Sequence, residues 1–255
     1  MTYLRTPSIT ILHKWLLPLL GALLFAAGAP GRADHLPPGI LVIHFRTPPD
    51  YMQKPAGSGP YTKQDIQEAM QLAKIGDAEA QSNLGVMLAS RGEYAKAAYW
   101  EEQAANAGLD TAAYNLGTLY FNGEGFPKDY VTAHHWFMQS ADRGNMYAEF
   151  QLAMTYNTGQ GVQKDPAKEI YWYEKAARQG LSPAQYNLAV IYHNGDETAR
   201  DDVKAYAWML LAKKGGLDAG DALKIISREM SPAQIQEAEK LSRNLAAAPV
   251  QDMRK

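Results

Sequence analysis

A hydrophobic pattern with a fixed spacing of 36 residues runs through the middle of the chain, from about residue 80 to residue 216. Tryptophans recur at this spacing: Trp100, Trp136, Trp172 and Trp208. Four glycines, one after each tryptophan, recur at the same spacing of 36 residues: Gly108, Gly144, Gly180 and Gly216. A strict period in this range is typical of stacked repeats, in which each unit contacts its neighbours, and not of a closed globule.

Each unit contains two stretches in which apolar residues have helical spacing. In the first stretch, an alanine lies four residues before a leucine and a bulky residue lies four residues after it, so all three share one helix face. We assign the leucines and tyrosines of that face in the last three units to the core: Leu116, Leu152, Leu188, Tyr120, Tyr156 and Tyr192. The second stretch follows an aspartate that can cap a helix, such as Asp129 or Asp165, and carries the tryptophan. Large aromatic residues at a fixed repeat position favour core packing over the alternative, a ligand cage, so we assign the four tryptophans to the core as well.

The same patterns place the domain boundaries in the second part of the chain. Thr62 and Asp65 resemble a capping pair before a short amphipathic stretch. After Gly216 the pattern changes, and Ser231 followed by Pro232 marks the start of a helix with a single apolar stripe, as a terminal cap requires. The predicted parts are half a repeat over 61–76, four repeats over 77–220, capping helices over 221–246 and a disordered tail over 247–255.

The first 33 residues resemble a secretory signal peptide. Basic residues precede an apolar run, Trp15 to Ala27, which is too short to cross a bilayer comfortably. Small residues around Gly31-Arg32-Ala33 provide a cleavage site, and no cysteine follows the run, which excludes a lipoprotein anchor. We therefore expect 1–33 to be a signal peptide and the protein to be exported, to the periplasm of a bacterium; an uncleaved N-terminal anchor is the alternative.

A proline-rich segment separates this signal from the repeats. Residues 34–60 contain six prolines, so we expect an extended linker. Within it, Ile40 to Phe45 is apolar enough to form a short strand or to dock on the repeats.

The best-preserved units, 112–144 and 148–180, contain the run Ala-x-Tyr-Asn-Leu-Gly-x-x-Tyr-x-x-Gly-x-Gly or a close variant, followed by Lys-Asp, the tryptophan and a final glycine. This run resembles the Sel-one-like repeat (SLR), a relative of the tetratricopeptide repeat. The unit over 184–216 departs from it at Glu197, which replaces the second loop glycine, and 80–108 lacks the Gly-x-Gly loop. The resemblance implies an all-α, right-handed solenoid of helical hairpins. It also implies an adaptor that holds other proteins in complexes, and many bacterial members work in the cell envelope.

Composition limits the chemistry open to this chain. The formal net charge of −2 becomes −5 without residues 1–33, and no dense basic stripe occurs, so we do not expect nucleic acid as a partner. The absence of cysteine excludes disulfides, thiolate zinc sites and a cysteine nucleophile. For the same reason, the β-lactam binding or hydrolysis linked to some cysteine-rich SLR proteins is not carried over to this chain.

The remaining candidates for catalysis and cofactor binding are weak. Gly123-Glu124-Gly125 and Gly159-Gln160-Gly161 are glycine-rich, but they join two helices and lack the lysine of a phosphate-binding loop. His134 and His135 point in different directions on a helix, so we expect no metal site. Neither Ser-x-x-Lys nor Gly-x-Ser-x-Gly occurs. We therefore expect no catalytic residues, no cofactor and no metal.

The expected binding surface is a concave groove formed by the first helices of the hairpins. Positions offset from the core face form one stripe along these helices. We assign the partner-binding role to ten of them: Tyr114, Thr118, Phe121, Tyr147, Phe150, Met154, Asn157, Tyr186, Val190 and His193. Aromatic side chains would provide contact area and neighbouring amides would bond a peptide backbone. Tyr114, Phe150 and Tyr186 share one repeat position, and bracing of neighbouring repeats explains their aromatic character equally well.

These inferences favour a non-catalytic envelope scaffold that binds a protein or peptide of unknown identity in its groove. Two alternatives remain open. One is an envelope enzyme that acts on cell-wall material or β-lactams, and the other is a regulator that restrains a membrane sensor through the 34–60 arm.

Overall fold

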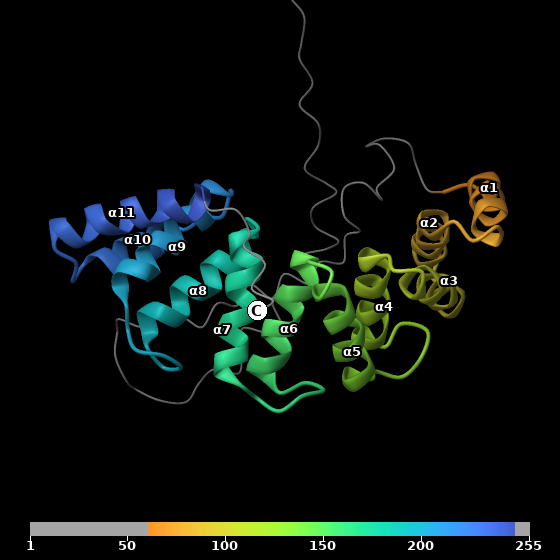
Figure 1. Cartoon of the computed structure of the whole chain (residues 1–255), viewed down its shortest axis with the longest axis horizontal. Coiled ribbons are helices and arrows are strands. Elements are labelled where there is room, and N and C mark those ends of the chain that lie inside the picture. The colour runs from red at the N-terminus through yellow and green to blue at the C-terminus, as the bar shows by residue number, and fades with distance from the viewer. Residues whose placement is uncertain (1–60, 248–255) are drawn as a thin grey trace, which may run out of the picture. The chain divides into compact units, whose positions relative to one another are not determined.

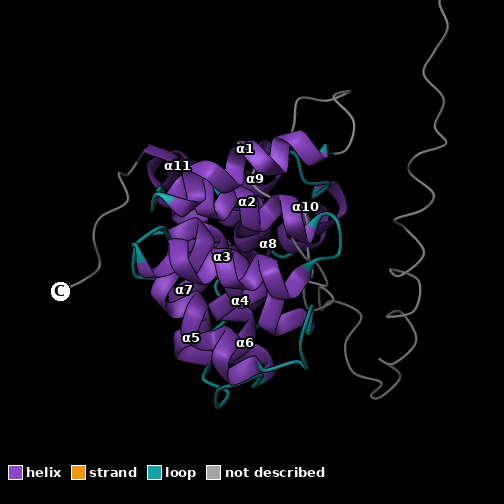
Figure 2. Ribbon diagram, turned by 90° about the vertical axis from the view of Figure 1, so that its right-hand side faces the viewer, coloured by secondary structure: helices purple, strands orange, loops and turns teal. Residues whose placement is uncertain are grey.

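The computed structural model describes residues 61–247, and this part of the chain contains helices and loops and no strand. Figures 1 and 2 show the helices. Their bounds are α1 (Lys63–Lys74), α2 (Ala78–Ala89), α3 (Tyr94–Asn106), α4 (Asp110–Asn122), α5 (Tyr130–Ala141), α6 (Met146–Thr158), α7 (Pro166–Arg178), α8 (Ser182–Asn194), α9 (Asp202–Lys214), α10 (Gly220–Ser227) and α11 (Pro232–Ala247). The signal peptide expected at 1–33, the linker at 34–60 and the tail after Ala247 lie outside the described residues.

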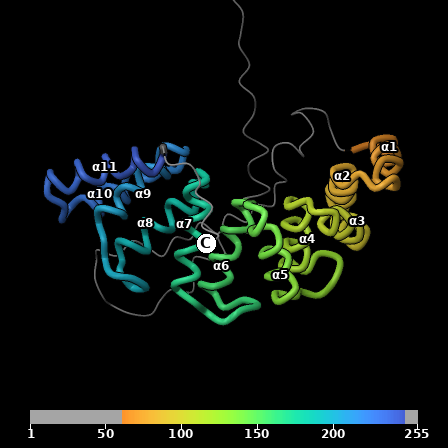
Figure 3. The backbone as a smooth tube through the Cα atoms, viewed as in Figure 1, coloured from red at the N-terminus to blue at the C-terminus, as the bar shows by residue number. Residues whose placement is uncertain are grey.

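Consecutive helices pair into hairpins, and the hairpins stack in chain order (Figure 3). The hairpins are α2 with α3, α4 with α5, α6 with α7 and α8 with α9, and the second helix of each packs on the first helix of the next. At one end α1 packs on α2, and at the other α10 and α11 pack on α9. The prediction of an all-α solenoid of helical hairpins is confirmed.

Local sequence sets where the helices begin and end. The side chains of Asp129 and Asp165 accept hydrogen bonds from backbone N–H groups in the first turns of α5 and α7, as predicted for N-caps. Thr62 and Asp65 form the predicted reciprocal capping box at the start of α1. Helix α6 ends at Gly159, which adopts a left-handed conformation with φ +76°, a conformation that costs little only for glycine.

The core lies between the two helices of each hairpin and between successive hairpins. Leu116, Leu152 and Leu188 are completely or almost completely buried. Alanines at the contact faces let the helix backbones approach closely, for example Ala133 and Ala205, which have no exposed surface. The core is therefore built from leucines and aromatic rings set between small residues, as the repeat pattern indicates.

The remaining residues assigned to the core differ in their burial. Trp172, Trp208, Tyr156 and Tyr192 are buried, whereas Trp100, Trp136 and Tyr120 are partly buried at the edges of the same clusters. Tyr120 stacks on Phe126, with 4.3 Å between the ring centroids. The tryptophans toward the C-terminal end are thus more completely enclosed than those toward the N-terminal end.

Candidate functional site

Six of the ten residues assigned to the groove keep some exposed surface. They lie on the first helices of three successive hairpins, α4, α6 and α8, and we call them the exposed row: Thr118, Phe121, Tyr147, Met154, Asn157 and Tyr186. Phe121, Tyr147, Met154 and Tyr186 pack with one side against the core. The core therefore holds these side chains in place while they present the other side to solvent.

The other four residues assigned to the groove are buried, and this corrects the prediction. Phe150 has no exposed surface, because it packs on Tyr173 of α7 with 5.5 Å between ring centroids. Tyr114, Val190 and His193 are each 3% exposed. These four side chains pack inside the stack of hairpins and have almost no exposed surface for contact with a partner.

Aromatic contacts connect the row across the hairpins. Tyr114 of α4 lies beneath Tyr147 of α6, with ring centroids 6.0 Å apart, and the Thr118 hydroxyl donates to the Tyr114 carbonyl over 3.0 Å. Phe121 contacts Tyr130 and Phe137 of α5 at 5.1 and 6.2 Å. Burial raises the pKa of Tyr114 to about 12, so this phenol stays neutral near pH 7. Tyr147 and Phe121 of the row thus pack on other aromatic side chains of α4 and α5.

The polar end of the row leads to a buried carboxyl group. Asn157 Nδ2 donates to Glu169 Oε1 over 2.9 Å, and Glu169 is only 2% exposed. Burial, and after it the neighbouring Glu197, raises the pKa of Glu169 to about 8, against the opposing effect of the Asn157 hydrogen bond. Glu169 is therefore mostly protonated at neutral pH.

Two further carboxyl groups lie inside the stack. Ser82 Oγ and Asn115 Nδ2 donate to Glu101 over 2.8 and 3.1 Å, and burial raises the pKa of Glu101 well above its usual range. Glu149 has no exposed surface; Lys175 Nζ lies 3.2 Å from its Oε1, and burial outweighs this cation and raises its pKa.

Sequence reasoning missed these buried carboxyl groups, although the repeat period contains a signal for two of them. Glu101 occupies the repeat position of Phe137, Tyr173 and Met209, all of which are buried. Glu169 occupies the position of Ala97, Ala133 and Ala205, also buried. A glutamate at a core position of a repeat indicates a buried acid.

The Gly-x-Gly loops hold one hairpin against the next. A Cβ on Gly125 would come within 2.9 Å of both Tyr94 Cβ and Ala95 N at the start of α3. Gly161 lies against the start of α5 in the same way. Close backbone approach between neighbouring hairpins accounts for glycine at these two positions.

The histidines are engaged in separate contacts. His134 Nδ1 lies 3.0 Å from Thr155 Oγ1, and His193 Nδ1 lies 2.7 Å from Asp202 Oδ1. Among residues 61–247, no three His, Cys, Asp or Glu side chains converge in a way that could hold a metal ion. The helices of this same region are also not long and apolar enough for any of them to cross a membrane.

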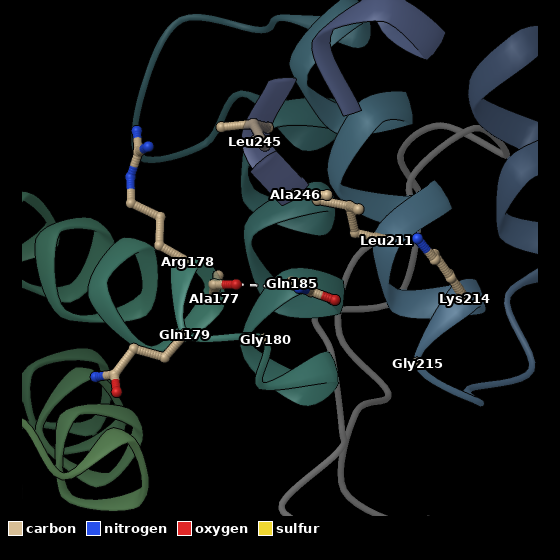
Figure 4. Close-up of a pocket in the computed structure, with 10 residues that line it drawn as sticks. All are labelled: Ala177, Arg178, Gln179, Gly180, Gln185, Leu211, Lys214, Gly215, Leu245 and Ala246. Atoms are coloured by element: carbon tan, nitrogen blue, oxygen red, sulfur yellow. Dashed lines mark hydrogen bonds between the residues drawn. The ribbon is translucent and has the colours of Figure 1, made fainter. Parts of the chain in front are cut away.

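A shallow pocket of about 360 Å³ lies near the C-terminal ends of α7, α9 and α11 (Figure 4). Gln185 Nε2 donates to the Ala177 carbonyl over 3.0 Å, while Gln185 Oε1 has no hydrogen-bond partner within the part of the chain that the structure describes. Arg178 and Lys214 lie in the last turns of α7 and α9, where cations offset the partial negative charge of helix ends. The helix ends therefore account for both positive charges, and we do not assign a ligand to this pocket.

Comparison with known proteins agrees with this architecture. A family model described as Sel1 repeat matches residues 57–75, 78–109, 111–145, 147–181 and 182–217. The matched segments follow the hairpins closely: 147–181, for example, contains α6 and α7 except for the first residue of α6. Among curated proteins no significant match is found.

Solved structures that match this chain include Sel1 repeat proteins. One from Oxalobacter formigenes is 26% identical, with a TM-score of 0.60 over 71% of this chain and 79% of that chain. A protective antigen of uropathogenic Escherichia coli with an SLR fold is 28% identical, with a TM-score of 0.47 over 71% of this chain and 48% of that chain. A Sel1 repeat protein from Klebsiella pneumoniae subsp. pneumoniae is 25% identical, with a TM-score of 0.47 over 71% of this chain and 92% of that chain.

Proposed function

Because the chain belongs to the Sel1 repeat family, whose model matches more than half of its 255 residues, we propose that it is a non-catalytic scaffold that binds a protein segment along the exposed row. Sel1 repeat proteins are generally protein-interaction scaffolds. The observation that carries the proposal is the row itself, in which partly exposed apolar side chains, together with one hydroxyl and one amide, lie along the first helices of three successive hairpins and pack against the core.

The chemistry of the row suits an extended segment of polypeptide. Phe121, Tyr147 and Tyr186 provide flat apolar area at a small cost in side-chain entropy, since they already pack against the core. Asn157 and Thr118 provide hydrogen-bonding groups for a partner backbone. We expect the segment to cross the three hairpins, one apolar side chain to each.

The site of action is the second part of the proposal. Residues 1–33 have the composition of an export signal, so the scaffold would act in the envelope, in the periplasm. Fractionation of cells that express the full chain, followed by mass determination of the mature N-terminus, tests this. Recovery of the uncleaved chain from the cytoplasm would contradict it.

Photo-crosslinking tests the row directly. A photoreactive phenylalanine at Tyr186 or Met154 should give discrete adducts in living cells, and the same residue at the exposed Glu102 of α3 should not. Purification and mass spectrometry of the adduct would identify the partner.

The identified partner then allows a quantitative test. The double variant Tyr186→Ala, Met154→Ala should weaken its binding about tenfold or more, because contact area in the middle of an interface is lost. Tyr99→Ala is the matched control, since Tyr99 is an aromatic residue of α3, 55% exposed and outside the row. Equal affinities for the double variant, the control and the unchanged protein would move the binding surface elsewhere, and deletion of 34–60 would then test the arm.

A further inference from the structure

Two departures from the repeat pattern meet at the junction between the third and fourth hairpins. Glu169, in the first turns of α7, stands where the other hairpins have a buried alanine. Glu197, in the loop between α8 and α9, stands where the two preceding loops have Gly125 and Gly161. Gly161 lies against the first residues of α5, which start the second helix of the preceding hairpin. The same position in the next loop brings Glu197 to the start of α7, beside Glu169.

The surroundings of Glu169 leave one of its oxygens without a donor. Its Oε1 accepts from Asn157 of α6, whereas its buried Oε2 has no hydrogen-bond partner among the N–H and O–H groups of residues 61–247. Glu197 of the α8–α9 loop is exposed and interacts electrostatically with Glu169. A carboxylate oxygen buried without a donor, next to a second carboxylate, is unfavourable unless one of the two groups holds a proton.

The other groups around the pair do not neutralise it. Lys164 of the α6–α7 loop attracts the Glu169 charge, but this is the smallest of the effects on Glu169. Burial, and after it the nearby Glu169, raises the pKa of the Tyr173 phenol on α7, so this phenol stays protonated. A proton on Glu169 Oε2 that is donated to the Glu197 carboxylate therefore satisfies the oxygen and removes the repulsion.

We propose that a proton shared by Glu169 and Glu197 acts as a latch that ties the α8–α9 loop to the start of α7, and that loss of this proton loosens the fourth hairpin from the third. Loss of the proton leaves two adjacent carboxylates, one of them buried. Because Asn157 of the exposed row is bonded to the same carboxyl group, the latch connects the protonation state to the row. The latch is a property of the isolated chain and does not depend on the proposed scaffold function.

The direction of the pH effect follows from the pKa of Glu169, which is about 8 in the folded chain against an ordinary value of 4.5. The folded state holds the proton more tightly than the unfolded state, so the latch is complete at low pH. Its contribution to stability decreases as the pH rises through the ordinary carboxyl range and is lost above about pH 8.

Carboxyl ¹³C NMR on the full chain tests the latch without a partner. One glutamate signal should titrate at about pH 8 and disappear in Glu169→Gln. In Glu197→Gly, which restores the residue of the two preceding loops, it should titrate lower by about one pH unit or more. Titration of Glu169 in the ordinary range near pH 4.5, or no shift in Glu197→Gly, would overturn the proposal.

A second measurement reports the loosening itself. Trypsin cleaves after Arg200, an exposed residue of the α8–α9 loop. The ratio of the cleavage rate at pH 9 to that at pH 7 should be severalfold higher for the unchanged protein than for Glu169→Gln, with Glu102→Gln as the matched control on an exposed helix face. Equal ratios for all three proteins would show that no latch opens, and the NMR titration of the unchanged protein remains decisive if Glu169→Gln fails to fold.

Discussion

Gly161, in the loop between α6 and α7, lies directly against the backbone carbonyl of Tyr130 at the start of α5. A Cβ at this position would overlap that carbonyl, and the φ of +76° at Gly161 already disfavours any other residue. The loop glycine is therefore a contact between hairpins as well as a turn residue.

Substitution of Gly161 separates these two roles. Gly180→Ala imposes a positive φ on alanine with no atom within 4 Å of the new Cβ, so it should cost about 1–2 kcal/mol of unfolding free energy. Gly161→Ala adds the overlap with backbone and should cost about 1–3 kcal/mol more. Denaturant unfolding of both variants measures the difference, and equal losses would contradict the contact between hairpins.

The partial exposure of the N-terminal tryptophans predicts unequal costs of truncation. Trp172→Ala should lower the free energy of unfolding by about 3–5 kcal/mol, because it removes a side chain that is only 7% exposed and leaves a cavity in its place. Trp136→Ala should cost less, since Trp136 is only partly buried. Thermal unfolding followed by circular dichroism checks the order; a shift of under a couple of degrees for Trp172→Ala would rule out its place in the core.

The buried carboxyl group of Glu101 predicts a pH dependence of the unfolding free energy that does not involve the latch. Its folded pKa is raised well above 4.5, so its contribution is full at acid pH and is lost as the pH rises toward the folded pKa, by at most about 1.4 kcal/mol for each pH unit. Glu101→Gln keeps the neutral hydrogen-bonded form, so its stability should fall less between pH 5 and pH 8. Urea unfolding at both pH values measures the slope, with Glu102→Gln as control; a slope unchanged from that of the control would mean that Glu101 ionises freely.

Replacement of Lys175 should destabilise the protein more than replacement of Glu149, its partner in a buried ion pair. Lys175→Met leaves a fully buried carboxylate without its cation and should cost about 3 kcal/mol. Glu149→Gln should be nearly neutral, because Gln185 at the same repeat position donates to the Ala177 carbonyl and a glutamine at 149 can do the same one hairpin earlier. The double variant Glu149→Gln, Lys175→Met should recover most of the unfolding free energy that Lys175→Met loses. If the double variant is as unstable as Lys175→Met alone, this explanation is refuted.

The architecture could be predicted from local and repeated signals along the chain. The 36-residue period, the capping aspartates and the terminal glycines are local or strictly repeated signals, and each unit folds into the same hairpin because each carries the same signals. Leu116, Leu152 and Leu188 are buried for that reason, since every leucine meets an equivalent neighbour.

Which members of a repeat position reach the surface depends on the packing of one hairpin against the next and could not be predicted from the repeat pattern. Tyr114, Phe150 and Tyr186 occupy one position of the repeat, yet the first two are buried and the third is partly exposed. Tyr147 of the next hairpin covers Tyr114, whereas after Tyr186 and α9 the chain continues into α10 and α11 in place of another repeat. Exposure depends on the side chain that the neighbouring unit places on top, and the spacing within one unit carries no information about it. The pairing of Glu169 with Glu197 has the same origin, because residues far apart in the chain meet only when the hairpins stack.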